Sequence, residues 1–492
     1  MSRVMSRVIS NEQRPSLALV TAALLATYMQ TVNISLPNAA LLQIQGGLSM
    51  SDDEVGWVFS AYIAASVITM PLTRWLAGRF GRKIIYQSFT AVFALGLVLA
   101  AQANTPLQFI GTRILQGAAS GPLAPLSLAI LLDILPPRLH ARISQAWTVT
   151  AVLGIVSGPS IGGWVAEYPG WHALFYLSLP VAGFILLAAG LSLPEKKAAQ
   201  SPPFDFFGFG SFALGMTGLQ MMLDRGERLE WFCSPEIWAE AGASALGFYT
   251  YLVHMFTAKT HFLNKALFRD RNFVLSSIMF FAFGFVLLPT MALTSPMLDE
   301  LLNYPADTTG FVAIPRSIAL VAALLFAERF SQRIGSRRLV AAGGILTIYA
   351  NWRMLGYSTS MDWRPVIIAG IIQGAGLGML MAALTKTAFS TLDPVHRPEG
   401  IVLFNLSRLY GSTIGIALVQ IFLYGNTQAM HLSLAKDLVS TGNFPGSLAA
   451  LNEMITRQAA FVGVIGQFKL MMIVMLITTP LVIFLRKPQP TT

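Results

Sequence analysis

Charged residues are scarce in this 492-residue chain. Asp, Glu, Lys and Arg together make up 11% of the sequence, whereas a typical soluble protein has about 25%. Hydrophobic residues make up 54%. So few charges cannot cover the surface of soluble domains of this total size, which excludes a soluble protein and favours a chain whose solvent is the lipid bilayer.

Residues that bind metals or form disulfides are equally sparse. Cys233 is the only cysteine, which excludes an intrachain disulfide and a cysteine-based metal cluster, and the six histidines form no HExxH-type pair. The sequence has no GxxxxGK phosphate-binding motif, so direct use of ATP is not expected. We therefore predict no cofactor and no metal, and the histidines, isolated from acidic partners, do not suggest a polytopic membrane enzyme.

Long apolar runs are abundant instead. A helix crosses a bilayer with about 20 predominantly apolar residues, and a helix satisfies its own backbone hydrogen bonds there. Fourteen runs fit this description: 16–38, 54–73, 84–103, 106–132, 143–165, 172–193, 207–223, 236–257, 272–295, 308–327, 339–357, 364–385, 399–424 and 464–485. The sequence therefore predicts an all-α polytopic membrane protein with 14 transmembrane helices.

Basic residues are concentrated on one side of this topology. With the N-terminus in the cytoplasm, 22 Lys and Arg fall in cytoplasmic segments, and six fall on the opposite side: Arg225, Arg228, Arg353, Arg364, Lys436 and Arg457. This asymmetry follows the positive-inside rule, so we expect both termini in the cytoplasm. The net charge of +10 then reflects topology rather than a nucleic-acid surface.

The two halves of the sequence contain similar segments. The segment 113–119 (RILQGAA) is similar to 370–376 (GIIQGAG), and the same offset relates Gly154 and Gly158 to Gly411 and Gly415. Repeated halves with a site at their interface are the architecture of secondary transporters.

The repeat predicts a division of the chain into three parts. We expect an N-terminal six-helix bundle at 1–195, two inserted helices at 196–264, and a C-terminal six-helix bundle at 265–492. The longest polar stretch, 425–460, is expected to be an external loop between the last two helices, with a short interfacial helix within it left open.

Two of the apolar runs carry distinctive residues. Within 143–165, small residues and a proline occur close together at Gly154, Gly158, Pro159, Gly162 and Gly163. Such glycines let membrane helices approach closely, although ordinary helix packing would explain the same pattern.

Within 106–132, Arg113 is followed by Gln116 and Gly117. A guanidinium in the middle of a membrane helix is costly in lipid. It should therefore face a cavity or bind the backbone carbonyls of neighbouring helices.

These features resemble the major facilitator superfamily and its fourteen-helix drug:proton antiporter branch. The glycine-rich run is similar to the helix 5 signature of that branch, and Arg113 matches its helix 4 motif, which implies a role for Arg113 in proton coupling. The loop after the second run is similar to a cytoplasmic gating motif, and it departs from that motif at Arg74 and Gly78. The candidate gating residues are Arg79, Gly81, Arg82, Lys83 and Asp133, where Asp133 is expected to pair with Arg82 or Lys83. A plain cluster of cytoplasmic positive charge would account for the basic residues equally well.

The first helix departs from the family pattern in an informative way. Val32 to Pro37 resembles the second half of the helix 1 motif, but Tyr28 stands where the branch usually has an acidic residue. The resemblance implies that a carboxylate embedded in helix 1 is the usual proton carrier of this branch. Helix 1 of this chain has no such carboxylate, because Tyr28 occupies the position.

The candidate cavity residues are polar or basic. They are Tyr28, Gln30, Asn33, Gln116, Gln373, Asn405 and Arg408. Each could equally join helices by hydrogen bonds. No carboxylate is evident in the middle of a predicted span, which favours an anionic, zwitterionic or neutral substrate over an organic cation.

The leading interpretation is a secondary active exporter of drugs or small organic metabolites in the bacterial inner membrane, working by proton antiport and alternating access. Two alternatives stay open: a dedicated exporter of one anionic or zwitterionic metabolite such as a siderophore, and an uncoupled facilitator. The expected partners are a small-molecule substrate, protons and the lipid bilayer, without nucleic acid. A periplasmic adaptor and an outer-membrane channel are left open, and two repeats in one chain predict a monomeric unit.

Overall fold

The fold is that of a computed structural model, which describes residues 16–193, 204–226, 229–258, 265–393, 396–441 and 448–486. The described residues form helices, turns and irregular segments, without a strand among them. The predicted boundaries of the inserted pair, at 195 and 264, lie outside the described residues. So do eight of the basic residues on which the topology rests: Arg3, Arg7, Arg14, Lys196, Lys197, Arg228, Lys259 and Lys487.

The first part of the chain is a bundle of long helices. It comprises α2 (Leu17–Ser35) with η1 (Leu36–Ala40) and α3 (Leu41–Leu48), α4 (Asp52–Thr69), α5 (Leu72–Phe80), α6 (Arg82–Ala101), α7 (Pro106–Ile134), η2 (Pro137–Leu139), α8 (His140–Glu167), α9 (Ala173–Tyr176) and α10 (Leu179–Ser192). Local sequence signals set several of these ends. Ser51 and Glu54 form a capping box at the start of α4, and Thr105 caps α7 directly before Pro106.

The remaining helices form a central pair and a second bundle. The pair is α11 (Phe206–Arg225) and α12 (Pro235–Thr257), joined through η3 (Trp231–Cys233). The second bundle comprises α13 (Lys265–Arg269), α14 (Arg271–Pro296) with the π-helical η4 (Met297–Leu301), α15 (Ala306–Ile334), α16 (Ser336–Met354), α17 (Arg364–Ala388), α18 (Arg397–Thr441), α19 (Leu448–Thr478) and η6 (Thr479–Phe484).

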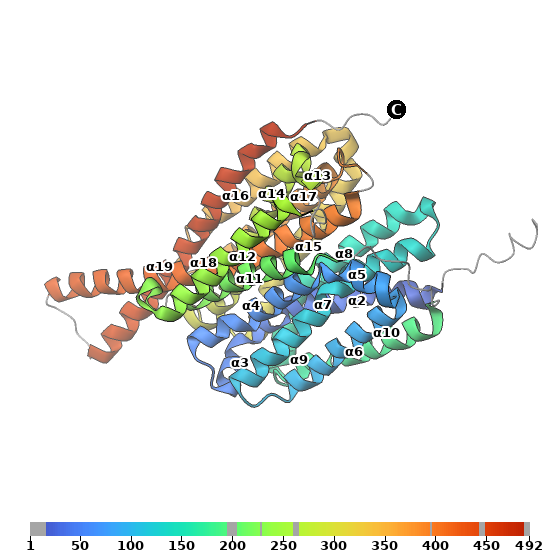
Figure 1. Cartoon of the computed structure of the whole chain (residues 1–492). Helices are drawn as coiled ribbons and strands as arrows, with labels where there is room; N and C mark the ends of the chain where they lie inside the picture. The colour runs from blue at the N-terminus through green and yellow to red at the C-terminus, as the bar shows by residue number, and fades with distance from the viewer. Residues whose placement is uncertain are drawn as a thin grey trace, which may run out of the picture.

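The helices pack mainly within these groups (Figure 1). In the first bundle α2 packs on α8 and α4 packs on α7, and in the second α14 packs on α18 and α15 on α17. The two bundles touch through α8 with α15 and through α4 with α18. The α11–α12 pair contacts both bundles, because α11 lies against α4 and against α18.

The same backbone devices recur in both bundles. Gly81 and Gly335 both have φ +89°, a conformation that favours glycine, and each lies immediately before the next long helix, α6 or α16. A Cβ on Gly117 of α7 would overlap the carbonyl of Tyr62 in α4, and a Cβ on Gly374 of α17 would overlap the carbonyl of Arg316 in α15. The repeat seen in the sequence therefore places small residues at corresponding helix crossings.

Eleven of the described helical segments are long and apolar enough to cross a membrane. All fourteen predicted runs coincide with helices, and the three outside this set are α4, α12 and α16; the apolar part of α4, Glu54–Thr69, is shorter. Large apolar side chains cover the outside of the bundle, as at Leu191, which is 87% exposed. A surface of this kind is stable against lipid rather than water.

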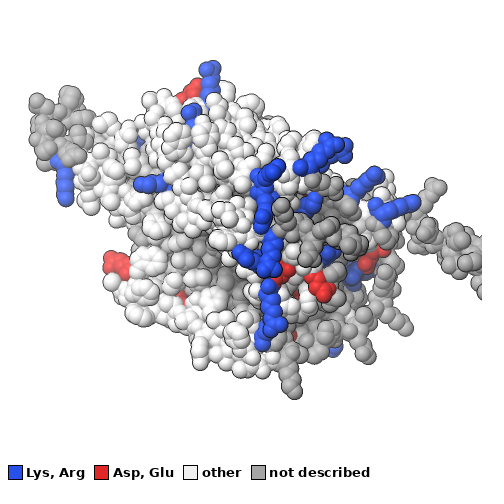
Figure 2. All heavy atoms as spheres, turned by 90° about the horizontal axis from the view of Figure 1, so that it is seen from above, with Lys and Arg blue, Asp and Glu red and all other residues white. Residues whose placement is uncertain are grey.

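Charge is distributed unevenly along the bundle. On the face shown in Figure 2, Lys and Arg gather toward the right-hand part and the remaining described surface is mainly uncharged. Figure 1 places the two ends of the described chain at this same right-hand end of the bundle. On this face, most of the basic residues therefore lie toward the end that holds the two ends of the described chain.

The stretch 425–460 is not a loop over most of its length, so this prediction was wrong. Helix α18 continues to Thr441 and α19 begins at Leu448, and the two helices project from the bundle side by side (Figure 1). The physical reason is that no proline occurs between Pro398 and Pro445 to end the helix. In the sequence, Thr441 is followed by Gly442, Asn443, Pro445 and Gly446, residue types that do not favour a helix.

Candidate functional site

A cavity lies where the two bundles meet. It is formed by α8 of the first bundle and by α14, α15, α16 and α17 of the second, and its volume is about 40 Å³. The space holds a few water molecules and is too small for an organic molecule. Its lining residues are Val156, Pro159, Leu287, Thr290, Met291, Thr294, Ser295, Thr309, Val312, Ala313, Arg316, Ser317, Leu320, Met354, Val366 and Gly370.

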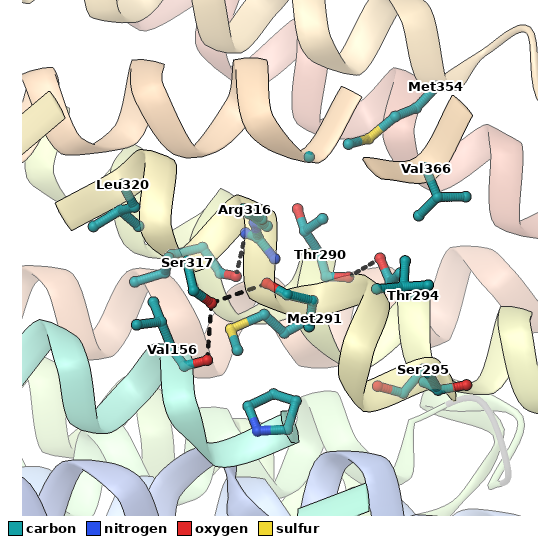
Figure 3. Close-up of a pocket in the computed structure, with 16 residues that line it drawn as sticks. Val156, Thr290, Met291, Thr294, Ser295, Arg316, Ser317, Leu320, Met354 and Val366 are labelled. Atoms are coloured by element: carbon teal, nitrogen blue, oxygen red, sulfur yellow. Dashed lines mark hydrogen bonds between the residues drawn. The ribbon is translucent and has the colours of Figure 1, made fainter. Parts of the chain in front are cut away.

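Arg316 is the only ionisable side chain among these lining residues (Figure 3). One guanidinium nitrogen donates a 3.2 Å hydrogen bond to the carbonyl of Leu287. Gly370 of α17 faces the stem of Arg316, where a Cβ would stand 3.3 Å from the Cβ of Arg316. The surrounding hydroxyls and the lone guanidinium can bind a carboxylate or another anionic group, and no carboxylate lines the cavity to bind a cation.

Arg113 lies elsewhere, inside the first bundle. Its Nε donates to the Val58 carbonyl at 2.9 Å, one terminal nitrogen donates to Gln116 Oε1 at 2.7 Å, and the other donates to the Asn33 carbonyl at 3.0 Å. The guanidinium also lies 4.4 Å from the ring centre of Tyr62. The side chain is fully buried, so of the two environments expected for Arg113 the structure shows binding to backbone carbonyls.

The polar residues of helix 1 also join helices. Tyr28 shares a 2.9 Å hydrogen bond with Ser157 of α8, and Asn33 donates a 3.0 Å bond to Ser178, which precedes α10. Gln30 is buried, and its side-chain oxygen has no hydrogen-bond partner. None of these residues lines the cavity between the bundles.

The candidates in the second bundle have similar surroundings. Gln373 donates 3.2 Å bonds to Thr290 and to Asn351, and Thr290 in turn lines the cavity. Asn405 donates to a carbonyl of its own helix. One guanidinium nitrogen of Arg408 is buried without a hydrogen-bond partner. Gln373 therefore contacts a residue of the cavity wall but does not line the cavity itself.

The glycine-rich segment of α8 packs against α2 and η1. A Cβ on Gly154, Gly158 or Gly162 would overlap atoms of that neighbour, and at Gly158 it would stand 2.8 Å from the nitrogen of Leu36. Gly163 is buried in the same helix. These glycines allow the close approach of two helices within the first bundle.

The opposite face of α8 meets α15 of the second bundle. Ser160 donates a 2.9 Å hydrogen bond to the carbonyl of Gly310, and Ser317 donates a 2.9 Å bond to the carbonyl of Val156 (Figure 3 shows the latter). Pro159 lies between these contacts and lines the cavity. Helix α8 is therefore at once a packed member of one bundle and a wall of the interface.

The predicted gating residues lie at the end of the first bundle. Arg82 at the start of α6 forms an ion pair with Asp133 near the end of α7. Arg79 is exposed at the end of α5, Gly81 makes the turn between α5 and α6, and Lys83 is half-buried. Of the two predicted pairings of Asp133, the structure contains the one with Arg82.

The comparisons with known proteins address the family. The model of the Major Facilitator Superfamily matches residues 19–306 and 274–435. The chain belongs to this superfamily. The resemblance noted in the sequence is thereby confirmed, and the protein is a membrane transporter rather than an enzyme.

Individual relatives and solved structures agree with this. The chain is 29% identical over 424 residues to "Multidrug export protein EmrB" of Haemophilus influenzae, covering 85% of this chain and 82% of that protein. It is 28% identical over 498 residues to "Fatty acid resistance protein FarB" of Neisseria gonorrhoeae, covering 96% of each. A bacterial homologue of the lysosomal transporter Spinster, in an inward-facing conformation, has the same fold, with a TM-score of 0.63, 13% identity and coverage of 96% of this chain and 98% of that one.

Arg316 is the residue that the sequence interpretation left out of the site. The signal was present, because an arginine within the apolar run 308–327 is as costly in lipid as Arg113. The sequence did not show which of the two arginines faces the interface between the bundles.

Proposed function

We propose that this protein is a secondary active exporter that carries small organic molecules out of the cytoplasm in exchange for protons. Relatives named for multidrug export and for fatty acid resistance cover most of the chain, and they support export as the direction. The observation that carries the proposal is the cavity at Arg316, because it lies where α8 of one bundle meets α15 of the other.

Alternating access would occur by rocking of the two bundles about this interface. The contacts of Ser160 with Gly310 and of Ser317 with Val156 cross from one bundle to the other. Breaking them would open a path into a cavity that is now too small for an organic molecule. The hydrogen bonds of Arg113 with Gln116 and Asn33 would keep the first bundle rigid as it moves. Arg113 would then affect proton coupling by holding the helices in place rather than by carrying a proton.

The topology of the proposal has fourteen spans in the bacterial inner membrane, with both termini in the cytoplasm. The end where basic residues gather is then the cytoplasmic end, and the projecting parts of α18 and α19 lie on the periplasmic side. That position suits a contact with a periplasmic adaptor and an outer-membrane channel. One chain contains both bundles and forms the transporting unit.

A second candidate is a dedicated exporter of one carboxylate-bearing compound. The observation that favours it is the single cationic side chain in a cavity without a carboxylate. A buried guanidinium binds a carboxylate by charge-assisted hydrogen bonds and repels an organic cation.

Transport into everted membrane vesicles tests both proposals. Vesicles energised to an acidic interior should accumulate labelled probes, and a proton ionophore should abolish the accumulation. The probes are decanoate as a carboxylate, chloramphenicol as a neutral drug and ethidium as a cation. Accumulation of decanoate alone favours the dedicated exporter. Uptake that is insensitive to the ionophore would contradict antiport and leave an uncoupled facilitator.

A further inference from the structure

The inserted helices carry a group of carboxylates that the transport cavity lacks. Asp224 lies in the last turn of α11 and accepts a 2.9 Å hydrogen bond from Gln220. Glu240 lies on the facing side of α12, where one carboxylate oxygen accepts a 2.8 Å bond from Arg225. Arg225 also forms an ion pair with Glu236. Two carboxylates therefore pair with a single guanidinium, and Asp224 is the residue next to that arginine in the sequence.

Glu240 is the carboxylate of this group that has an unsatisfied hydrogen-bond acceptor. The residue is 9% exposed, and its second carboxylate oxygen is buried without a hydrogen-bond partner. Glu236, by contrast, has a side chain that is 59% exposed and well solvated. One oxygen of the Glu240 carboxylate is therefore paired with Arg225, and the other has an acceptor position that a further donor could fill.

The two helices are held together tightly around this group. A Cβ on Gly218 of α11 would stand 2.8 Å from the backbone oxygen of Glu240 and from the backbone nitrogen of Ser244. Gly215 and Gly247 meet in the same way one turn further along. The α11–α12 pair therefore moves as one unit, with its carboxylates at fixed positions.

This unit touches both halves of the transporter. Helix α11, which carries Asp224, lies against α4 of the first bundle and against α18 of the second. Helices α4 and α18 also meet directly, where Gly56 faces the side chain of Gln420. Movement of the bundles therefore changes what α11 packs against.

We propose that Asp224 and Glu240 form the proton-carrying site of the transporter, in place of the carboxylate that helix 1 lacks. This inference rests on the proposed antiport. A proton binds to a carboxylate oxygen of the pair in one conformation and is released from the same oxygen in the other. Gln220 contacts Asp224, Arg225 contacts Glu240, and Glu236 pairs with the same Arg225. Because α11 carries the charge of Asp224 and lies against both α4 and α18, its contacts couple protonation to movement of the bundles.

Two activities of the same vesicles test the site. Proton release driven by decanoate is followed with a pH-sensitive dye, and exchange of labelled for unlabelled decanoate is followed without a pH gradient. Asp224→Asn and Glu240→Gln should abolish proton release and retain exchange. Asp224→Glu, which keeps the carboxyl, should retain both. The matched control is Asp362→Asn, at an exposed aspartate paired with Arg364, and it should behave as the wild type.

Three results would overturn the inference. Proton release that persists in both Asp224→Asn and Glu240→Gln would show that the carrier is elsewhere. Loss of exchange together with proton release, in variants present in the membrane at wild-type amounts, would make the group structural. A wild-type protein that exchanges decanoate but releases no protons would contradict the proposed antiport itself, which is a different result from the first two.

Discussion

Gly158 of α8 lies directly against Ser35 at the end of α2. A Cβ at this glycine would overlap the Ser35 hydroxyl oxygen, which itself donates a hydrogen bond back to the carbonyl of Ile155. The helix-breaking residue Pro37 follows in η1, so the crossing lies where α2 changes to a tighter turn. The run of small residues in the sequence therefore forms the face of α8 that packs closely against α2 and η1.

The first prediction concerns this crossing. Gly158→Ala should lower the thermal stability of the purified transporter, because overpacking a tight helix contact costs about 1–3 kcal/mol. Gly183 in α10 is the matched control, since nothing lies within 4 Å of a Cβ placed there. Gly183→Ala should be neutral or stabilising by up to about 1 kcal/mol, because alanine favours the helix. Equal melting temperatures for the two variants would contradict the close contact.

The second prediction concerns topology. Cys233 is the only cysteine and is exposed between α11 and α12. In the proposed topology of fourteen spans with cytoplasmic termini, this turn lies on the periplasmic side. A membrane-impermeant maleimide should label it in spheroplasts without detergent, and Cys233→Ser should abolish the labelling. Labelling that appears only after the membrane is dissolved would place this turn in the cytoplasm and overturn the proposed orientation.

The sequence predicted the helices well because each is a long apolar run, a signal that lies within the run itself. It predicted a repeat from the similar segments 113–119 and 370–376, and Gly117 and Gly374 of these segments lie at crossings of α7 with α4 and of α17 with α15. The surroundings of Arg113 and Arg316 could not be predicted in this way. Both are arginines in apolar helices, and what distinguishes them is which neighbouring helices face them, a property of contacts between segments far apart in the chain.

The acidic group of the central pair shows the same limit. The predicted run 207–223 ends one residue before Asp224, and Glu240 lies near the start of the predicted run 236–257. The structure extends α11 to Arg225 and places Asp224 inside it. The difference of a few residues at a helix end determines whether this carboxylate belongs to a loop or to a packed helix.

The third prediction separates two roles of Arg113. Lysine cannot reach the carbonyls of Val58 and Asn33 and the Gln116 amide at once, because its ammonium is a single point of charge. Arg113→Lys should therefore destabilise the protein by about 1.5–3 kcal/mol. Exchange and proton-driven accumulation of decanoate should fall together.

The control for Arg113 is Arg364→Lys, at an arginine whose side chain is 73% exposed. It should change neither stability nor transport. Loss of proton-driven accumulation with exchange intact in Arg113→Lys would instead assign Arg113 a direct part in coupling.

The last prediction concerns the charge that the cavity recognises. Arg316→Gln keeps a polar side chain of similar length but removes the positive charge from a cavity that has no other ionisable lining residue. Charge-assisted hydrogen bonds contribute about 1.5–3 kcal/mol, so the apparent affinity for decanoate should fall roughly tenfold or more. Chloramphenicol, which carries no carboxylate, should be transported as before. Lys469→Gln, at an exposed lysine of α19, controls for the loss of a positive charge elsewhere in a span. An equal loss for both probes in Arg316→Gln would show that this arginine supports the packing of α14 and α17 rather than the recognition of an anionic group.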